Sequence, residues 1–313
     1  MISFFKTVNG RIAPIDTYES GCWINVVSPT ESEMSLLTDE LKIDGGFIKS
    51  GLDEEEVSRI ESDEGQTLII FDIPIAQSSQ TGNTTYSTLP MGVIIAHDFF
   101  ITVASREHAL IKEFSDGIVK NVETSRQMHF LLMLLLKASG KYLAYLRQID
   151  KLSTYVEKQL YKAMKNKELI QLLEMVKSLV YFSTSLKAVE VTLNKIQRSR
   201  YIPLDEEDAD LLEDVIVEIK QAIEMATIYS GILSGTMDAF ASVISNNLNI
   251  VMRVLASITI IMAVPTIVFS FYGMNTPLPL QGSPILGLWY VPLGIAIIAT
   301  VICAIVLKKK NMF

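Results

Sequence analysis

The 313-residue chain combines 49% hydrophobic residues with 20% charged residues and a net charge of −8. Residues 1–253 hold all 35 acidic residues and 24 of the 27 basic ones, a net charge of −11, and residues 254–313 hold only three lysines. An acidic domain of this kind argues against nucleic acid as a partner and favours cations, because phosphate binding needs clustered Lys and Arg. The two cysteines lie far apart, so we expect no disulfide framework and no thiolate metal site.

Residues 1–118 are predicted to form an α/β domain. Runs rich in Val, Ile and Phe predict strands at 1–8, 22–27, 67–75, 91–96 and 99–104, the last two joined as a hairpin. The segment 29–42 is helix-like, with Ser28 or Thr30 as its N-cap. The N-terminus lacks the features of a secretory signal, so we expect this domain in the cytoplasm.

Residues 119–204 are predicted to form a cytoplasmic helical region. One helix is expected from about residue 123 to 165 and a second from about 167 to 200. The apolar run 129–136 is too short to span a bilayer, so it is expected in the core. Pro203 ends the second helix, and Asp205 can cap a third.

The third helix is predicted over residues 205–271, with Pro265 as its only internal proline. At 1.5 Å per residue it would be about 100 Å long, so we expect a stalk that continues into the bilayer. Residues 254–307 contain no Asp, Glu, Lys, Arg or His, which is enough for spans at 254–271 and 287–307. The alternative, a helical hairpin buried in a soluble core, is disfavoured because core helices need far fewer than 54 consecutive uncharged residues.

The predicted spans also indicate a topology. We expect the loop 272–286 outside the cytoplasm, and it is interrupted by Pro277, Pro279, Gly282 and Pro284. Arg253 flanks the first span, and the basic tail 308–313 follows the second. The positive-inside rule then places both termini in the cytoplasm, in a multi-pass protein of the plasma (inner) membrane.

Two stripes at helical spacing run along the third helix. The first is a heptad-like apolar seam that begins at Leu212 and Val215 and predicts packing against other helices. The second consists of polar or small residues: Asp238, Ser242, Ser245, Asn249, Met252, Ala256, Thr259, Ala263, Thr266 and Ser270. It is either a seam of small residues between packed helices or the lining of an ion pathway. In the second case Met252 and Leu255 would narrow the pathway near its cytoplasmic end.

Tyr272, Gly273, Met274 and Asn275 directly follow the first span, and this placement resembles the YGMN signature of the CorA divalent-cation transporters. The resemblance covers nearly the whole chain. It implies a homopentameric CorA-like channel, not an enzyme, that carries Mg²⁺ into the cytoplasm and tolerates Co²⁺ or Ni²⁺. A zinc transporter of the same superfamily, or a membrane-tethered cation sensor without transport, remains as an alternative.

The resemblance assigns roles to individual residues. A neutral ring of Asn275 carbonyls would accept hydrogen bonds from the water that Mg²⁺ retains, although asparagine is also a common helix C-cap. Gly273 would let the chain turn over the pore mouth. Thr266, Asn249 and Asp238 match pore-lining positions of relatives. The loop 276–287 carries no acidic residue, so Asn275 would have to do more of the selection.

The run 205–214 holds seven carboxylates in ten residues, which is either a solvated helix start or a regulatory Mg²⁺ site. Asp214 matches a regulatory acid of relatives, and Glu113 or Asp116 of a neighbouring subunit would be its partner. Bound Mg²⁺ would then hold the channel closed. An enzyme is disfavoured, because the sequence has no phosphate-binding glycine loop or nucleophile motif. His97, His108 and His129 are expected to be ordinary core or surface residues.

Overall fold

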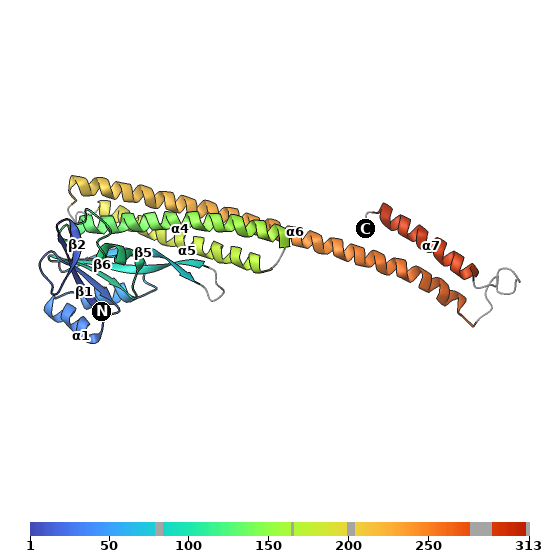
Figure 1. Cartoon of the computed structure of the whole chain (residues 1–313), viewed down its shortest axis with the longest axis horizontal. Helices are drawn as coiled ribbons and strands as arrows, with labels where there is room; N and C mark the ends of the chain where they lie inside the picture. The colour runs from blue at the N-terminus through green and yellow to red at the C-terminus, as the bar shows by residue number, and fades with distance from the viewer. Residues whose placement is uncertain (79–83, 164–165, 199–203, 276–289, 311–313) are drawn as a thin grey trace. The chain divides into compact units, whose positions relative to one another are not determined.

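The chain folds into two compact units, residues 1–235 and 236–313. The structure is a computed structural model that describes residues 1–78, 84–163, 166–198, 204–275 and 290–310 (Figure 1). The first unit contains a mixed β-sheet with helices on both faces. The second contains the C-terminal part of the long helix α6 (Glu206–Tyr272) and the helix α7 (Tyr290–Lys309).

The sheet has seven strands in the order β2-β1-β3-β7-β6-β5-β4 among the described residues. Their bounds are β1 Ile2–Val8, β2 Arg11–Ile15, β3 Trp23–Val27, β4 Arg59–Asp63, β5 Gln66–Ser78, β6 Thr84–Ala96 and β7 Phe99–Ala104. β3 and β7 pair in parallel, and the other neighbours are antiparallel. The five predicted strands are confirmed, and so is the hairpin, in which Ala96 pairs with Phe99.

Strands β2 and β4 were not predicted from the sequence. Each is five residues long and partly polar, RIAPI and RIESD, and they form the two edges of the sheet. Short, charged strands are typical of sheet edges, where an open row of backbone groups would otherwise pair with another chain. The charges of β4 and the proline in β2 therefore suit an edge position, and neither strand carries a long apolar run that would predict it.

One face of the sheet is covered by α1 (Glu31–Ser35), the π-helical turn η1 (Leu36–Glu40) and α2 (Gly45–Leu52). Leu37 and Ile48 are fully buried against Ile24 and Val103 of the sheet. Thr30 caps α1 in a capping box with Glu33, so of the two caps considered Thr30 is the right one. The helix-like segment predicted over 29–42 is helical from Glu31 to Glu40, and its second half is π-helical.

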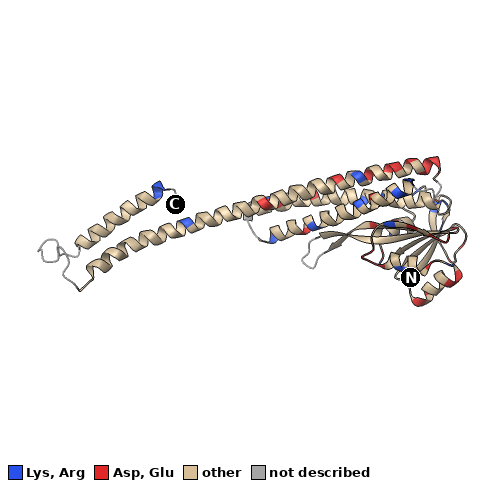
Figure 2. Cartoon of the chain, turned by 180° about the vertical axis from the view of Figure 1, so that it is seen from behind, with Lys and Arg blue, Asp and Glu red and all other residues tan. Residues whose placement is uncertain are grey.

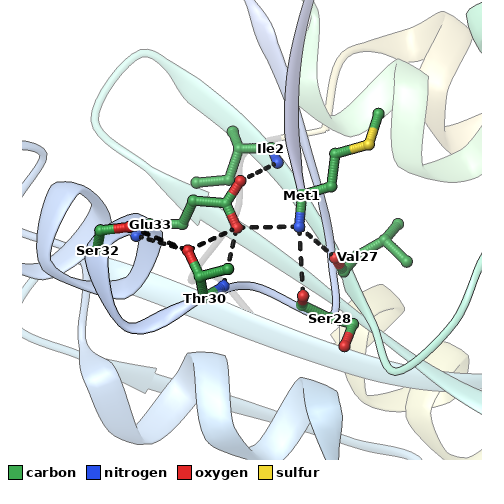
Figure 3. Close-up of polar contacts among 7 residues, drawn as sticks. All are labelled: Met1, Ile2, Val27, Ser28, Thr30, Ser32 and Glu33. Atoms are coloured by element: carbon green, nitrogen blue, oxygen red, sulfur yellow. Dashed lines mark hydrogen bonds and ion pairs between the residues drawn. The ribbon is translucent and has the colours of Figure 1, made fainter.

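Glu33 also joins this cap to the N-terminus (Figure 3). The Met1 amino group lies 3.0 Å from the Glu33 carboxylate and donates to the carbonyls of Val27 and Ser28. The backbone N–H of Thr30, followed by the Met1 amino group, lowers the pKa of Glu33 to about 2. The end of β3 is thereby tied to the start of β1.

The other face is covered by α3 (Ala109–Ser115), α4 (Gln127–Ala163) and α5 (Asn166–Arg198). Phe130 stacks on Phe100 with ring centroids 4.4 Å apart and meets Trp23 edge-on at 5.2 Å. Most of the apolar run 129–136 is buried, which confirms that it is core. The two helices predicted from 123 and 167 are confirmed, with starts at Gln127 and Asn166.

The third predicted helix is confirmed as α6, which runs without a break from Glu206 to Tyr272 and contains Pro265. Asp205 precedes it and accepts a hydrogen bond from the Asp208 N–H at 2.7 Å, as expected of a cap. In the first unit its seam residues Leu212, Val215 and Ile219 are buried, which confirms the predicted packing of that part of the seam. Helix α7 spans Tyr290–Lys309.

Candidate ion pathway and selectivity motif

The second half of α6 and all of α7 are long and apolar enough to cross a membrane. Figure 2 shows that both segments are almost free of charged residues. Few of their side chains are buried, and large apolar residues such as Met262, Ile267 and Ile298 are more than 60% exposed. Apolar surface of this extent needs lipid or another protein chain to cover it.

The polar stripe of α6 lies on an open surface of the chain. Every member from Asp238 to Ser270 is exposed, and so is Leu255. Met252 and Leu255 are each 56% exposed. The described part of the chain therefore leaves the polar members of this stripe uncovered, and Met252 and Leu255 as well.

Hydroxyl groups on the stripe donate their protons to the helix that carries them. Ser242 Oγ donates to the Asp238 carbonyl at 3.1 Å, Thr259 Oγ1 to Leu255 at 2.9 Å, and Thr266 Oγ1 to Met262 at 3.1 Å. Each donor is satisfied locally, which makes a hydroxyl tolerable in an apolar segment. The hydroxyl oxygens keep lone pairs that can accept hydrogen bonds from outside the helix.

The YGMN motif forms the end of α6. Tyr272 is its last residue, and the Gly273 N–H still donates to the Phe269 carbonyl at 2.9 Å. A Cβ at Gly273 would lie 3.1 Å from that carbonyl oxygen, so glycine is favoured here by space rather than by a left-handed backbone. Asn275 follows in a bend, and its side chain is exposed. Most of the predicted loop, from residue 276, lies outside the described residues.

The expected regulatory acids are not brought together within one chain. Asp214 is exposed on α6, Glu113 pairs with Lys141 at 2.7 Å, and Asp116 is the C-cap of α3. Across the described ranges, no group of three or more His, Cys, Asp or Glu side chains is placed to hold a metal ion.

The start of the acidic run carries an ion-pair network that the sequence did not reveal. Arg126 contacts Asp205, Glu207 and Asp208 at 2.8, 2.9 and 3.5 Å. The backbone N–H of Asp208, then Arg126, holds the pKa of Asp205 below its usual value. His129 Nδ1 lies 3.0 Å from Asp208 Oδ1, so His129 is a core residue as expected, but one with a specific partner.

His108 is also a core residue, with a structural role. Its Nδ1 accepts a hydrogen bond from the Leu110 N–H at 3.0 Å and so caps α3. Burial is the main cause that lowers its pKa to about 4. His108 is therefore neutral near pH 7 and needs no ligand to explain it.

These features define a class of protein: a membrane cation transporter with a large α/β domain and two C-terminal apolar helices. Residues 18–309 match the family described as "CorA-like Mg²⁺ transporter protein". A cobalt/magnesium transport protein CorA from Methanocaldococcus jannaschii is 30% identical over 86% of this chain and 84% of its own length. The chain belongs to the CorA-like Mg²⁺ transporter family, and its transported substrates are divalent cations.

Solved structures agree in fold. The complete structure of the CorA magnesium transporter from M. jannaschii superimposes with a TM-score of 0.80 at 24% identity, over 99% of this chain and 96% of that one. The soluble domain of the same transporter matches 76% of this chain and 95% of its own, with a TM-score of 0.67 at 25% identity. The similarity therefore extends through both units, so it is not confined to the α/β domain.

Proposed function

We propose that this chain forms a channel-like homopentamer that carries hydrated Mg²⁺, and also Co²⁺ or Ni²⁺, into the cytoplasm. The observation that carries the proposal is the exposed stripe of small and polar residues from Asp238 to Ser270, which leads to Asn275. Polar side chains in a membrane span are costly when they face lipid. Copies of α6 arranged around an axis would turn this stripe toward a shared aqueous path.

The selectivity role falls to Asn275. Mg²⁺ dehydrates reluctantly and keeps several of its waters when it binds. An amide oxygen accepts hydrogen bonds from those waters but carries no charge, so it favours entry without holding the ion as tightly as a carboxylate. Several copies of Asn275, one from each chain, would form a neutral ring at the end of the stripe.

Met252 and Leu255 supply the gate in this proposal. Both are large and apolar, and both are more than half exposed in the single chain. Brought together around an axis, they would exclude water and so block an ion that cannot shed its hydration shell. The polar residues above and below them would remain hydrated.

Mg²⁺ bound between subunits would hold the closed state, with Asp214 as one ligand. Glu113 is already paired with Lys141, so Mg²⁺ would have to displace that lysine. Asp116 is exposed and has no ion pair within the described residues, which makes it the simpler partner. Loss of Mg²⁺ would leave like charges that repel one another and favour opening.

The decisive experiment measures ion uptake into proteoliposomes made with the purified full chain. Wild type should take up Mg²⁺ and Co²⁺, and Asn275→Ala should reduce selective Mg²⁺ uptake at least tenfold. Asn166→Ala, at the start of α5 in the first unit, is the matched control and should leave uptake unchanged. Absence of Mg²⁺ uptake by wild type would reject transport in favour of a sensor, and a preference for Zn²⁺ would favour the zinc alternative.

A further inference from the structure

A cavity of about 380 Å³ lies in the α/β domain, in the first unit. Its lining includes Val27 and Ala104, the last residues of the parallel strands β3 and β7. It also includes Met1, which lies beside Val27 (Figure 3). Open α/β sheets bind ligands beyond the carboxyl ends of parallel strands, where the following loops diverge. The volume also falls in the range of small-molecule sites.

The floor of the cavity is a row of polar side chains on an otherwise apolar sheet face. Ser3 of β1 pairs with Asn25 of β3, and Asn25 pairs with Thr102 of β7, so the three lie side by side across three strands. All three line the cavity. The neighbouring cross-strand row consists of Phe5, Trp23 and Phe100.

Hydrogen bonding sets the orientation of the Asn25 amide. Trp23 Nε1 can only donate, and it donates to Thr102 Oγ1 at 2.9 Å. The Thr102 hydroxyl keeps its own proton, which it donates to Asn25 Oδ1 at 2.9 Å. The amide nitrogen of Asn25 is left with two protons and no acceptor among the described residues, beside the cavity.

The walls and the rim of the cavity set two further requirements for a ligand. Phe5, Met91 and Ile111 form buried apolar walls, which suit a flat ring. Lys112 is exposed at the rim and has no ion pair within the described ranges. Arg106 and the Met1 amino group also border the cavity, but they are already paired with Glu54 and Glu33. Glu107 and Asp116 add negative charge, so the rim suits a single anionic group near Lys112 rather than a polyphosphate.

We propose that this cavity binds an oxopurine mononucleotide, with guanosine monophosphate (GMP) as the representative. The Asn25 amide and the Ser3 hydroxyl donate to the two adjacent acceptors of guanine, O6 and N7. Adenine carries an amino donor, N6, where guanine has the acceptor O6, so an adenine nucleotide should bind less tightly. The phosphate lies at the rim beside Lys112. This site is separate from the ion pathway and goes beyond the proposed transport function.

The test is calorimetric titration of the full chain in detergent, with GMP, AMP, guanosine and inorganic phosphate, at Mg²⁺ in excess over nucleotide. GMP should bind once per chain and at least tenfold more tightly than AMP. Asn25→Asp keeps the acceptor for Thr102 but removes the two donors, and should weaken GMP at least tenfold. Lys112→Gln should weaken GMP and leave guanosine unchanged, and the exposed Lys120→Gln should change neither.

Three results would overturn the site: no heat from GMP, GMP binding that is equal in wild type and both variants, or displacement of GMP by an equal concentration of inorganic phosphate. Thermal unfolding of each variant shows whether it is folded. If Asn25→Asp is unstable, the surface substitution Lys112→Gln still tests the site. Because no ion flux is measured, the outcome is independent of whether the chain transports Mg²⁺.

Discussion

His129 of α4 and Asp208 of α6 meet at 3.0 Å, and they are 79 residues apart in the chain. The same separation joins Arg126 to Asp205 and Ser139 to Glu218. A constant separation means that α4 and the first part of α6 run side by side in the same direction and without slippage. The start of the long helix is thus held in register on the α/β domain.

Arg126→Ala should loosen this attachment, because Arg126 alone contacts three carboxylates of the acidic run. We expect the unfolding temperature of the full chain to fall by about 2 °C and amide exchange in the first turns of α6 to accelerate. Asp208 is buried, so removing its cationic partner Arg126 should cost more stability than removing the partner of an exposed carboxylate.

Arg106→Ala is the control, because it removes one exposed ion pair with Glu54. It should leave exchange in α6 unchanged. Equal effects of the two substitutions, or an Arg126→Ala effect that persists fully in 1 M salt, would contradict an electrostatic attachment.

The parts of this protein that the sequence predicted are those with strong local signals. The 54 uncharged residues from 254 to 307 predict spans, and the position of Tyr272 and Asn275 after the first span indicates the family. The parts that were missed depend on tertiary contacts. Arg126 and His129 meet their partners only because α5 returns the chain antiparallel and α6 then runs beside α4.

Helix α2 is another element that local sequence signals do not predict. Its sequence GGFIKSGL contains three glycines, which count against a helix. The Asp44 side chain caps it, and burial of Phe47 and Ile48 outweighs the weak propensity. The glycine at 51 is needed for packing against the sheet, a reason that no local pattern contains.

Gly92→Ala should therefore destabilise the α/β domain. A Cβ at Gly92 would lie 2.9 Å from the Gly51 Cα, where α2 crosses β6, and backbone cannot move aside cheaply. We expect a loss of about 1–3 kcal/mol in the free energy of unfolding, measured by chemical denaturation.

Gly140→Ala is the matched control, because a Cβ there meets nothing within 4 Å in the middle of α4. It should stabilise the chain by up to about 1 kcal/mol. If both substitutions changed stability in the same direction, the close approach of α2 and β6 would not be the cause.

Asp72→Asn should stabilise the chain at neutral pH. Burial is the main cause that raises the pKa of Asp72 in β5, and its Oδ1 has no hydrogen-bond partner among the described residues. A carboxyl group whose pKa is raised by folding costs stability as the pH rises above its unfolded value of about 3.9. The gain from Asn should be a few degrees in the unfolding temperature at pH 7 and should shrink toward pH 4.

Asp63→Asn, on the exposed edge strand β4, is the control and should change stability by less than about 0.5 kcal/mol at either pH. A stabilisation by Asp72→Asn that did not depend on pH would point to packing rather than to the buried charge.

Leu255→Ser tests the apolar gate of the proposed pathway. In the proposed assembly Leu255 faces the axis, where a hydroxyl in place of the isobutyl group would let water remain. We expect Mg²⁺ leak into proteoliposomes, measured at saturating cytoplasmic-side Mg²⁺ that closes the wild type, to rise at least tenfold. Ile250→Ser is the control, because Ile250 is also exposed, at 45% against 56% for Leu255, but lies on the opposite side of the helix. A leak from Ile250→Ser as large as that from Leu255→Ser would mean that lost apolar area, and not the helix face that carries Leu255, opens the path.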